Sequence, residues 1–285
     1  MNGYEYERTL LASLANEAGE SPALTQGAGG NVSIKISDGR MLIKSSGCRL
    51  REVTPEKGIS LVDLGPLRKI LNGPEPDADS LSAAIKKSML ELNGTKEKPS
   101  VETGFHAMLG SAVVHQHSVY ANFIACCADG KIFAEKLFPE AVFVPFAAPG
   151  PELCLAIKKA AGMPRRGSGM MFFQNHGLAV FAEAPDKAME ISRKANKKIK
   201  DFFCLPDFNP DSVFAEHELH GGAAAEIFAR EGLPCGKILT LDQQLYCCAP
   251  SAAENITEDL KEIIGVVIWL LDAYRGHSLK PSFIQ

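Results

Sequence analysis

The segment 113-VVHQHSVYANF-123 places two histidines, one residue apart, at the end of an apolar run. If the run is a β-strand, His115 and His117 point to the same face, because side chains alternate along a strand. Two imidazoles on one face suit a divalent metal ion, but they also suit the solvent-facing end of a strand. Short motifs of this kind recur by chance, so the pair alone favours a structural or exposed role.

A third histidine occupies a comparable position later in the chain. His176 belongs to 174-QNHG-177, and the apolar runs on either side of it predict two strands around a tight turn. Gly177 allows the backbone to turn sharply there. Three histidines at strand ends could converge on one ion and leave a coordination position open, as catalytic zinc sites do. A purely structural zinc is less favoured, because only three ligands are evident and no cysteine stands at ligand spacing.

A carboxylate precedes the first two histidines. Glu102 is expected in the first turn of a helix that Ser100 caps. One interpretation is structural, because an acidic residue near a helix N-terminus is stabilised by about 0.3–1 kcal/mol. The functional interpretation is a general base held beside a metal ion.

Strands and helices are interspersed along the whole chain, which predicts an α/β protein. The Asp38-Gly39 turn between the strands 32–36 and 41–43 indicates that part of the sheet is antiparallel. Further elements are expected as helices at 4–18, 79–94, 119–128, 151–162 and 185–204, and as strands at 141–146, 170–173 and 178–181. Beyond Pro206 we expect helices near 215–231 and 253–275 with a strand near 238–247 between them.

Composition excludes several classes of protein. The net charge of −4 and the pI of about 6.0 do not indicate a nucleic-acid partner, and the basic run 193-RKANKKIK-200 is read as the solvated face of a helix. The longest unbroken apolar run, Val266–Leu271, is too short to span a membrane, and no signal peptide is visible. The eight cysteines include no CxxC pair, which predicts free thiols in a reducing cytoplasm.

Taken together, the motifs 28-AGGNVSIK-35, 43-IKSSG-47, 100-SVE-102, 114-VHQHSVYA-121 and 174-QNHG-177 resemble the class II aldolase/adducin family. Their order matches over roughly residues 8–204, and the combination is far more specific than any one part. The resemblance implies a three-layer α/β/α fold with a largely antiparallel central sheet. It predicts a catalytic domain over 1–205, with a helix-strand-helix extension over 206–285 packed on it. It also implies a homo-oligomer, since family members are commonly tetramers with active sites at subunit boundaries.

The resemblance also assigns roles to individual residues. His115, His117 and His176 match the family's zinc ligands, although another divalent metal is open, and Glu102 matches its acid/base carboxylate. The positions that hold the substrate phosphate in the family are matched here by Gly30, Asn31, Ser46, Gly47 and Ser100.

These roles are chemically coherent. Cleaving a carbon–carbon bond next to a carbonyl leaves an enediolate, and a zinc ion stabilises its negative charge as a Lewis acid. A carboxylate in a partly dry pocket suits the movement of a proton at carbon. A phosphate, bound by backbone N–H groups far from the broken bond, supplies binding energy and fixes orientation.

The expected function is therefore a zinc-dependent aldolase that cleaves a small, phosphorylated ketose by a retro-aldol reaction. An epimerase, dehydratase or decarboxylase of the same family remains open, as does an adducin-like interaction module without catalysis. Loss of a metal histidine or of the acid would mark that module, and all four residues are present. The family usually has a hydroxyl residue at the position of Ala28. The alanine here therefore weakens the assignment of a phosphate site. Lys35 and Lys44 could add charge, unless strand alternation sends them to the other face.

Four other features carry more ordinary expectations. His106, one helical turn after Glu102, is expected to be a packed core histidine rather than a residue that orients the acid. His217 and His220 are expected on an exposed helix surface, and Cys126 and Cys127 as buried structural thiols. The apolar stretch 263-IIGVVIWLL-271 is expected to be a docking helix, which could form part of a subunit interface with Trp269 as an anchor.

Overall fold

The hairpin predicted around Asp38 and Gly39 forms the middle of a large sheet. In the computed structural model, which describes residues 4–73, 76–162, 167–219, 224–231, 237–247 and 257–284, it consists of β1 (Asn31–Lys35) and β2 (Arg40–Lys44). The two strands pair antiparallel, with Ile34 opposite Leu42. Gly39 has a φ of 83°, a left-handed conformation that glycine adopts without strain. The sequence signal for this hairpin was therefore correct.

Eight strands form a single sheet in the order β4-β3-β2-β1-β5-β8-β7-β6. The other strands are β3 (Ile59–Asp63), β4 (Met89–Leu90), β5 (Ala112–Gln116), β6 (Val142–Val144), β7 (Gly169–Phe173) and β8 (Gly177–Ala182). Neighbouring strands pair antiparallel, apart from β6 and β7, which are parallel. The largely antiparallel sheet is confirmed.

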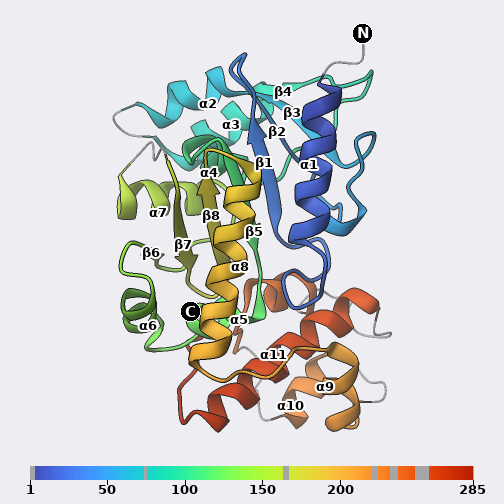
Figure 1. The fold of residues 1–285 in the computed structure, drawn as a ribbon, viewed down its shortest axis with the longest axis vertical. Coiled ribbons are helices and arrows are strands. Elements are labelled where there is room, and N and C mark those ends of the chain that lie inside the picture. The colour runs from blue at the N-terminus through green and yellow to red at the C-terminus, as the bar shows by residue number, and fades with distance from the viewer. Residues whose placement is uncertain are drawn as a thin grey trace.

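Helices cover both faces of the sheet and complete three layers (Figure 1). On one face lie α1 (Glu5–Ala18), α5 (Val119–Ala125) and α8 (Pro185–Phe202). On the other face lie α2 (Leu64–Leu71), α3 (Ala78–Ser88), α4 (Thr103–Met108) and α7 (Pro151–Ala161), while α6 (Gly130–Leu137) packs beside α5 and β6. Side-chain alternation sends Val114 into the core of the first face and Val113 into that of the second. The α/β/α prediction is confirmed.

Strand register brings the predicted site residues to one end of the sheet. Asn31, which begins β1, pairs with His115 near the end of β5. On the other side of β5, His115 pairs with Ala179 of β8. The turn 174–177 joins β7 to β8, so His176 lies beside the same strand ends. Segments from three separate parts of the sequence therefore meet at one place.

The C-terminal helices lie together at this same end of the molecule (Figure 1). They are α9 (Pro210–Glu216), α10 (Ala224–Arg230) and α11 (Glu258–Gly276), and α11 packs against α5 and α9. Trp269 of α11 is buried, and its ring stands edge-on to Tyr120 and Phe208 of the same chain. The docking helix predicted from the apolar stretch is therefore present, and Trp269 anchors it within its own chain.

Three element predictions were wrong. No strand forms within the described residues 237–247; a short helical turn, η2 (Gln243–Cys247), replaces it, because Thr240 Oγ1 accepts the Gln243 N–H and starts a helical turn. The single helix expected over 215–231 is divided between α9 and α10. The helix expected over 79–94 ends at Ser88, because Met89 and Leu90 pair with β3 at the sheet edge.

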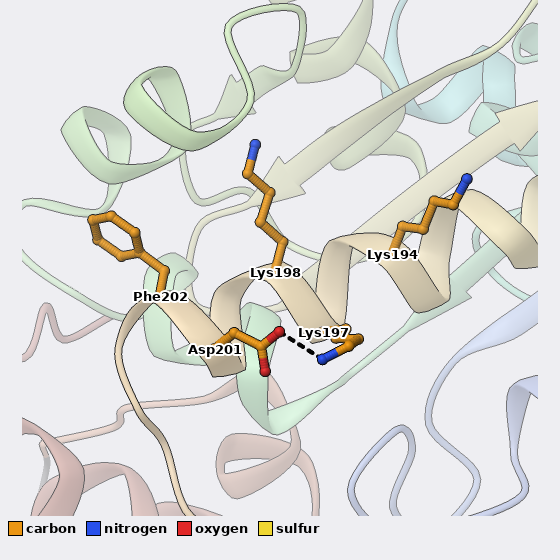
Figure 2. Close-up of a pocket in the computed structure, with 5 residues that line it drawn as sticks. All are labelled: Lys194, Lys197, Lys198, Asp201 and Phe202. Atoms are coloured by element: carbon orange, nitrogen blue, oxygen red, sulfur yellow. Dashed lines mark hydrogen bonds and ion pairs between the residues drawn. The ribbon is translucent and has the colours of Figure 1, made fainter.

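The basic run on α8 forms a solvated helix face, as predicted (Figure 2). The exposed Lys197 Nζ donates to Asp201 Oδ2 at 2.6 Å, and Lys194 pairs with Glu190. Lys198 donates to the carbonyl of Leu137 at 2.6 Å. These lysines are engaged by the chain's own acceptors, which does not favour a nucleic-acid surface. Across the described part of the chain, every helix is too short or too polar to traverse a bilayer.

Candidate metal centre

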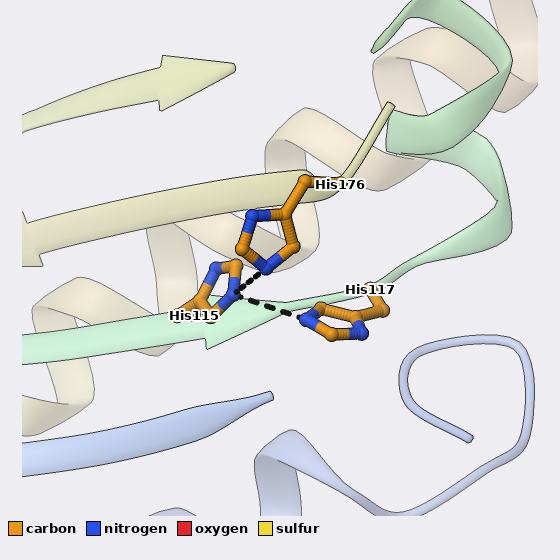
Figure 3. A group of neighbouring side chains, drawn as sticks. All are labelled: His115, His117 and His176. Atoms are coloured by element: carbon orange, nitrogen blue, oxygen red, sulfur yellow. Dashed lines mark hydrogen bonds between the residues drawn. The ribbon is translucent and has the colours of Figure 1, made fainter. Parts of the chain in front are cut away.

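The three predicted histidines converge on one point (Figure 3). His115 Nε2 lies 3.1 Å from His117 Nε2 and 3.2 Å from His176 Nε2. One nitrogen from each ring lies within 4.8 Å of the others, and all three side chains are buried. His115 and His117 share a face, as strand alternation predicts. The arrangement brings together the donor atoms that the sequence placed far apart.

The outer ring nitrogens of His115 and His117 have partners, whereas His176 Nδ1 has none among the described residues. His115 Nδ1 donates to the carbonyl of Leu178 at 3.0 Å, so its Nε2 presents a lone pair. Neutral His117 donates from Nδ1 to Asp242 Oδ2 at 2.6 Å and presents a lone pair at Nε2, which also accepts the Gly30 N–H at 3.4 Å. Two lone pairs 3.1 Å apart repel each other unless a proton or a cation lies between them. These rings therefore fit a divalent cation.

Burial disfavours a proton on His115 and on His176. It lowers the pKa of His115 and of His176 well below the usual range of histidine, and each ring is further disfavoured as a cation by its histidine neighbours. Burial also acts to lower the pKa of His117, but the Asp242 carboxylate outweighs it and raises that pKa. A metal ion satisfies the three nitrogens without requiring any of them to be protonated.

Glu102 faces the same point. Its Oε1 lies 3.4 Å from His176 Nε2, and its Oε2 lies 3.5 Å from His115 Nε2. Oε1 has no hydrogen-bond partner among the described residues, and burial raises the pKa of this carboxyl. Contrary to the sequence prediction, Glu102 precedes α4 rather than lying in its first turn, and its side chain caps no backbone N–H. The helix-dipole interpretation is therefore not supported, because the carboxylate points at the histidines.

A cavity of about 280 Å³ opens beside Glu102, His117 and His176. All the residues that the resemblance assigned to the substrate phosphate line it: Gly30, Asn31, Ser46, Gly47 and Ser100. Gly29 also lines it, and a Cβ there would lie 2.7 Å from His117 Nδ1, so the loop can approach the histidine only because it is glycine. The predicted residues are thus gathered around one small cavity.

The side-chain nitrogen of Asn31 is bound at the carboxylate, while its Oδ1 has no hydrogen-bond partner among the described residues. Its Nδ2 donates to Glu102 Oε2 at 2.6 Å and to Ser100 Oγ at 3.2 Å. Both amide protons are therefore used. The contribution of Asn31 to this geometry is to orient the acid.

Lys44 places a basic side chain in the cavity wall. Its Nζ donates to the carbonyls of Ala28 at 3.1 Å and Cys48 at 2.6 Å, and burial lowers its pKa to about 8. Lys35 instead donates to the carbonyl of Leu109 and does not line the cavity. Alternation along the two strands thus brings one of the two lysines to the site.

Sequence reasoning missed the part of the cavity wall that comes from the C-terminal region, whose described residues are 237–247 and 257–284. Leu241, Asp242, Leu245 and Tyr246 all line the cavity. Nothing in their local sequence pattern marks them, because they reach the histidines only through tertiary packing.

The other candidates lie outside the cavity. His106 is fully buried and its Nδ1 lies 2.7 Å from Ser33 Oγ, which makes it a core histidine as predicted. Cys126 and Cys127 are buried free thiols, and burial raises the pKa of both. His217 was wrongly predicted to be exposed, because Glu231 and Asp272 bind its two ring nitrogens at 2.8 and 2.7 Å. His220 lies outside the described residues.

Comparison with known proteins finds similar sequences and similar folds. The sequence model described as "Class II Aldolase and Adducin N-terminal domain" matches residues 10–197. A curated relative, the "Uncharacterized oxidoreductase YuxG" of Bacillus subtilis (strain 168), is 29% identical over 230 residues, which are 74% of this chain and 31% of that protein. The chain thus spans less than a third of that relative's length.

Two solved structures share the fold. The N-terminal class II aldolase domain of a conserved protein from Thermoplasma acidophilum is 22% identical, with a TM-score of 0.55, and the match covers 68% of this chain and 92% of that one. An aldolase II superfamily protein from Pseudomonas syringae is 13% identical, with a TM-score of 0.52, and the match covers 97% and 95%. The second likeness extends over the C-terminal helices as well as the sheet.

Proposed function

The chain belongs to the class II aldolase and adducin family, and from this premise we propose that it is a metal-dependent lyase. The proposed reaction is retro-aldol cleavage of a small ketose that carries a phosphate group. The observation that carries the proposal is the unpartnered Oε1 of Glu102, which is buried and faces the converging nitrogens of the three histidines. An interaction module without catalysis would have no need of this acid.

The three histidines would hold the ion, and zinc is the ion we propose, because three nitrogen ligands with an open position are typical of catalytic zinc sites. The ion, when bound, supplies Lewis-acid stabilisation of negative charge on the substrate oxygens. The remaining steps fall to the chain's own residues.

Glu102 is the proposed acid/base. As the carbon–carbon bond breaks, its electron pair passes to the carbonyl fragment, and the Glu102 carboxylate accepts the hydroxyl proton of the other fragment as the aldehyde forms. The carbonyl fragment then takes a proton at carbon from Glu102. A buried carboxyl with a raised pKa suits this exchange, because burial favours the protonated form that Glu102 takes up between the two proton transfers. Asn31 keeps the carboxyl in place through Oε2 and leaves Oε1 for the substrate.

The cavity wall that carries Lys44, Ser46 and Gly47 is the proposed site for the phosphate. Ser46 and Ser100 offer hydroxyl groups, Gly47 offers its backbone N–H, and Lys44 supplies a positive charge. Gly30 also lines the cavity, where its N–H donates to His117 Nε2 at 3.4 Å. Binding an anion away from the reacting carbons fixes the orientation of the substrate. The cytoplasmic location, the homo-oligomeric state and the domain boundary near residue 205 stay predictions from the sequence.

The test combines metal analysis with a screen for turnover. Purified protein is analysed for bound metal, and ketose 1-phosphates are screened for release of dihydroxyacetone phosphate, in the parent, in Glu102→Gln and in the control Glu56→Gln. Glu56 is an exposed carboxylate away from the cavity. We expect stoichiometric zinc in all three proteins and turnover lost in Glu102→Gln alone.

Two outcomes would contradict the proposal. Bound zinc without turnover of any sugar phosphate would assign the site to a different substrate class. Absence of stoichiometric metal from the parent would favour the interaction module.

A further inference from the structure

Residues 239–246 lie against the metal centre, although they come after the residues 10–197 that match the family. The turn that carries His176 holds them there. Asn175 Nδ2 donates to the carbonyl of Leu239 at 2.8 Å, and the Leu241 N–H donates to the carbonyl of Asn175 at 2.8 Å. The same Nδ2 donates to the carbonyl of Ser282 at 2.6 Å. The residue next to a metal histidine therefore fixes the position of the C-terminal region.

This anchoring places a carboxylate on a second histidine. Asp242 directly follows Leu241, and its Oδ2 lies 2.6 Å from His117 Nδ1. Both side chains are almost completely buried, with exposed fractions of 5% for Asp242 and 4% for His117. A buried carboxylate that accepts the outer N–H of a metal-bound histidine fixes its tautomer and its ring orientation and raises its basicity. In His117, the inner Nε2 is the atom that faces the other two rings.

The C-terminal region also holds the glycine loop, residues 27–30, whose Gly30 N–H donates to His117 Nε2 at 3.4 Å. The Ala28 N–H donates to Tyr246 Oη at 3.1 Å, and the Gly27 N–H donates to Glu262 Oε2 at 2.9 Å. Glu262 is buried on α11 and is also bound by Arg51 at 3.1 Å. Two walls of the cavity are therefore positioned by residues from the last quarter of the chain.

We propose that Asp242 is a positioning residue of the metal centre, and that the C-terminal region is an integral part of this centre within a single chain. The inference rests on the proposed function only in that the three histidines hold a divalent cation. Asp242 acts through His117, by holding Nε2 toward the ion. The structure offers a matched carboxylate for comparison, because Asp272 accepts from His217 Nε2 at 2.7 Å at a place outside the cavity.

The experiment compares metal affinity in the parent, Asp242→Asn, Asp242→Ala and the control Asp272→Asn, all as full-length chains. Dissociation constants for Zn²⁺ are measured by competition with a chromophoric chelator, and the absorption spectrum of the Co²⁺-loaded protein reports ligand geometry. We expect Asp242→Asn to bind zinc about 10–100-fold more weakly than the parent, Asp242→Ala to be at least as weak, and both to show an altered cobalt spectrum. Asp272→Asn is expected to keep the parent's affinity and spectrum.

Thermal unfolding of the metal-free proteins distinguishes a loss of zinc affinity from a loss of fold. We expect Asp242→Asn to unfold at the parent's temperature, since the asparagine side chain keeps the shape of aspartate. Unchanged zinc affinity and an unchanged cobalt spectrum in both Asp242 variants would overturn the inference. Because the readout is metal binding, it is independent of turnover. A parent that binds zinc but cleaves no ketose would defeat the proposed function and leave this test intact.

Discussion

The side-chain amide of Asn31 donates to Oε2 of Glu102 at 2.6 Å and leaves Oε1 without a partner among the described residues. Strand pairing explains how this contact is built. Asn31 opens β1 directly opposite His115 in β5, so the residue that orients the acid is in register with a metal histidine. One backbone ladder thereby sets the spacing between the acid and the proposed ion.

Asn31→Ala tests whether this orientation matters for catalysis. Hydrogen bonds to charged groups contribute about 1.5–3 kcal/mol, so we expect kcat to fall by about 10–150-fold. The metal content should stay at the parent's level, because Asn31 does not contact the histidine nitrogens that face the ion. Steady-state kinetics with metal analysis measures both quantities. An unchanged kcat in the folded, metal-loaded variant would show that Glu102 needs no such support.

Much of the fold follows from local signals. The Asp38-Gly39 hairpin and the strands around 174-QNHG-177 were predicted because turn residues and alternating apolar residues act within a few positions of each other. The convergence of His115, His117 and His176 was predicted because each stands at a strand end. Strand ends are where a sheet presents side chains to a site.

The C-terminal part of the site could not be predicted in this way. The apolar pattern near residues 238–247 resembles a strand, but Thr240 caps a helical turn instead. Asp242 and His117 are 125 residues apart in the sequence, and no sequence pattern near either residue predicts their contact. Lys44 was an ambiguous case, because alternation alone does not decide which face of a strand borders a cavity.

Lys44 should make substrate binding depend on pH. Burial lowers its pKa to about 8, so the amine loses its proton, and its attraction for an anion, as the pH rises from 7 to 9. We expect KM for a phosphorylated substrate to rise by up to about tenfold over this interval, because roughly a tenth of the amine is still charged one unit above its pKa. Lys44→Gln should show a raised KM that is constant over the same range. The control Lys57→Gln, at an exposed position, should retain the parent's rise. A rise of equal size in Lys44→Gln would remove Lys44 from the phosphate site.

His106 should weaken the fold on acidification. Burial lowers its pKa to about 3, whereas an unfolded histidine titrates near 6.5, so between these values the unfolded chain binds the additional proton. The free energy of unfolding therefore falls as the pH falls, by about 2 kcal/mol from this residue between pH 7 and pH 5. His106→Gln should lose about 2 kcal/mol less than the parent over that interval in urea unfolding.

Ser33→Ala is the matched control for this measurement, because it removes the hydroxyl bound to His106 but keeps the ring. It should cost about 1 kcal/mol at both pH values and retain the parent's pH dependence. If His106→Gln loses as much stability on acidification as the parent does, His106 is not the group responsible.

Gly177 should be the least replaceable glycine at the site. It follows His176 directly, and a Cβ at this position would lie 2.3 Å from the carbonyl oxygen of Gln116, a backbone atom of the neighbouring strand β5. We expect Gly177→Ala to force β5 and β8 apart, to lower the free energy of unfolding by about 1–3 kcal/mol and to weaken metal binding, because His115 lies in β5 and His176 directly precedes β8. Gly276→Ala is the matched control: nothing lies within 4 Å of its added Cβ in α11, so replacing a helical glycine there should stabilise the protein by up to about 1 kcal/mol. Denaturant unfolding and zinc titration of both variants measure these effects, and a Gly177→Ala variant with the parent's stability and zinc affinity would show that the strand ends can separate without disturbing the site.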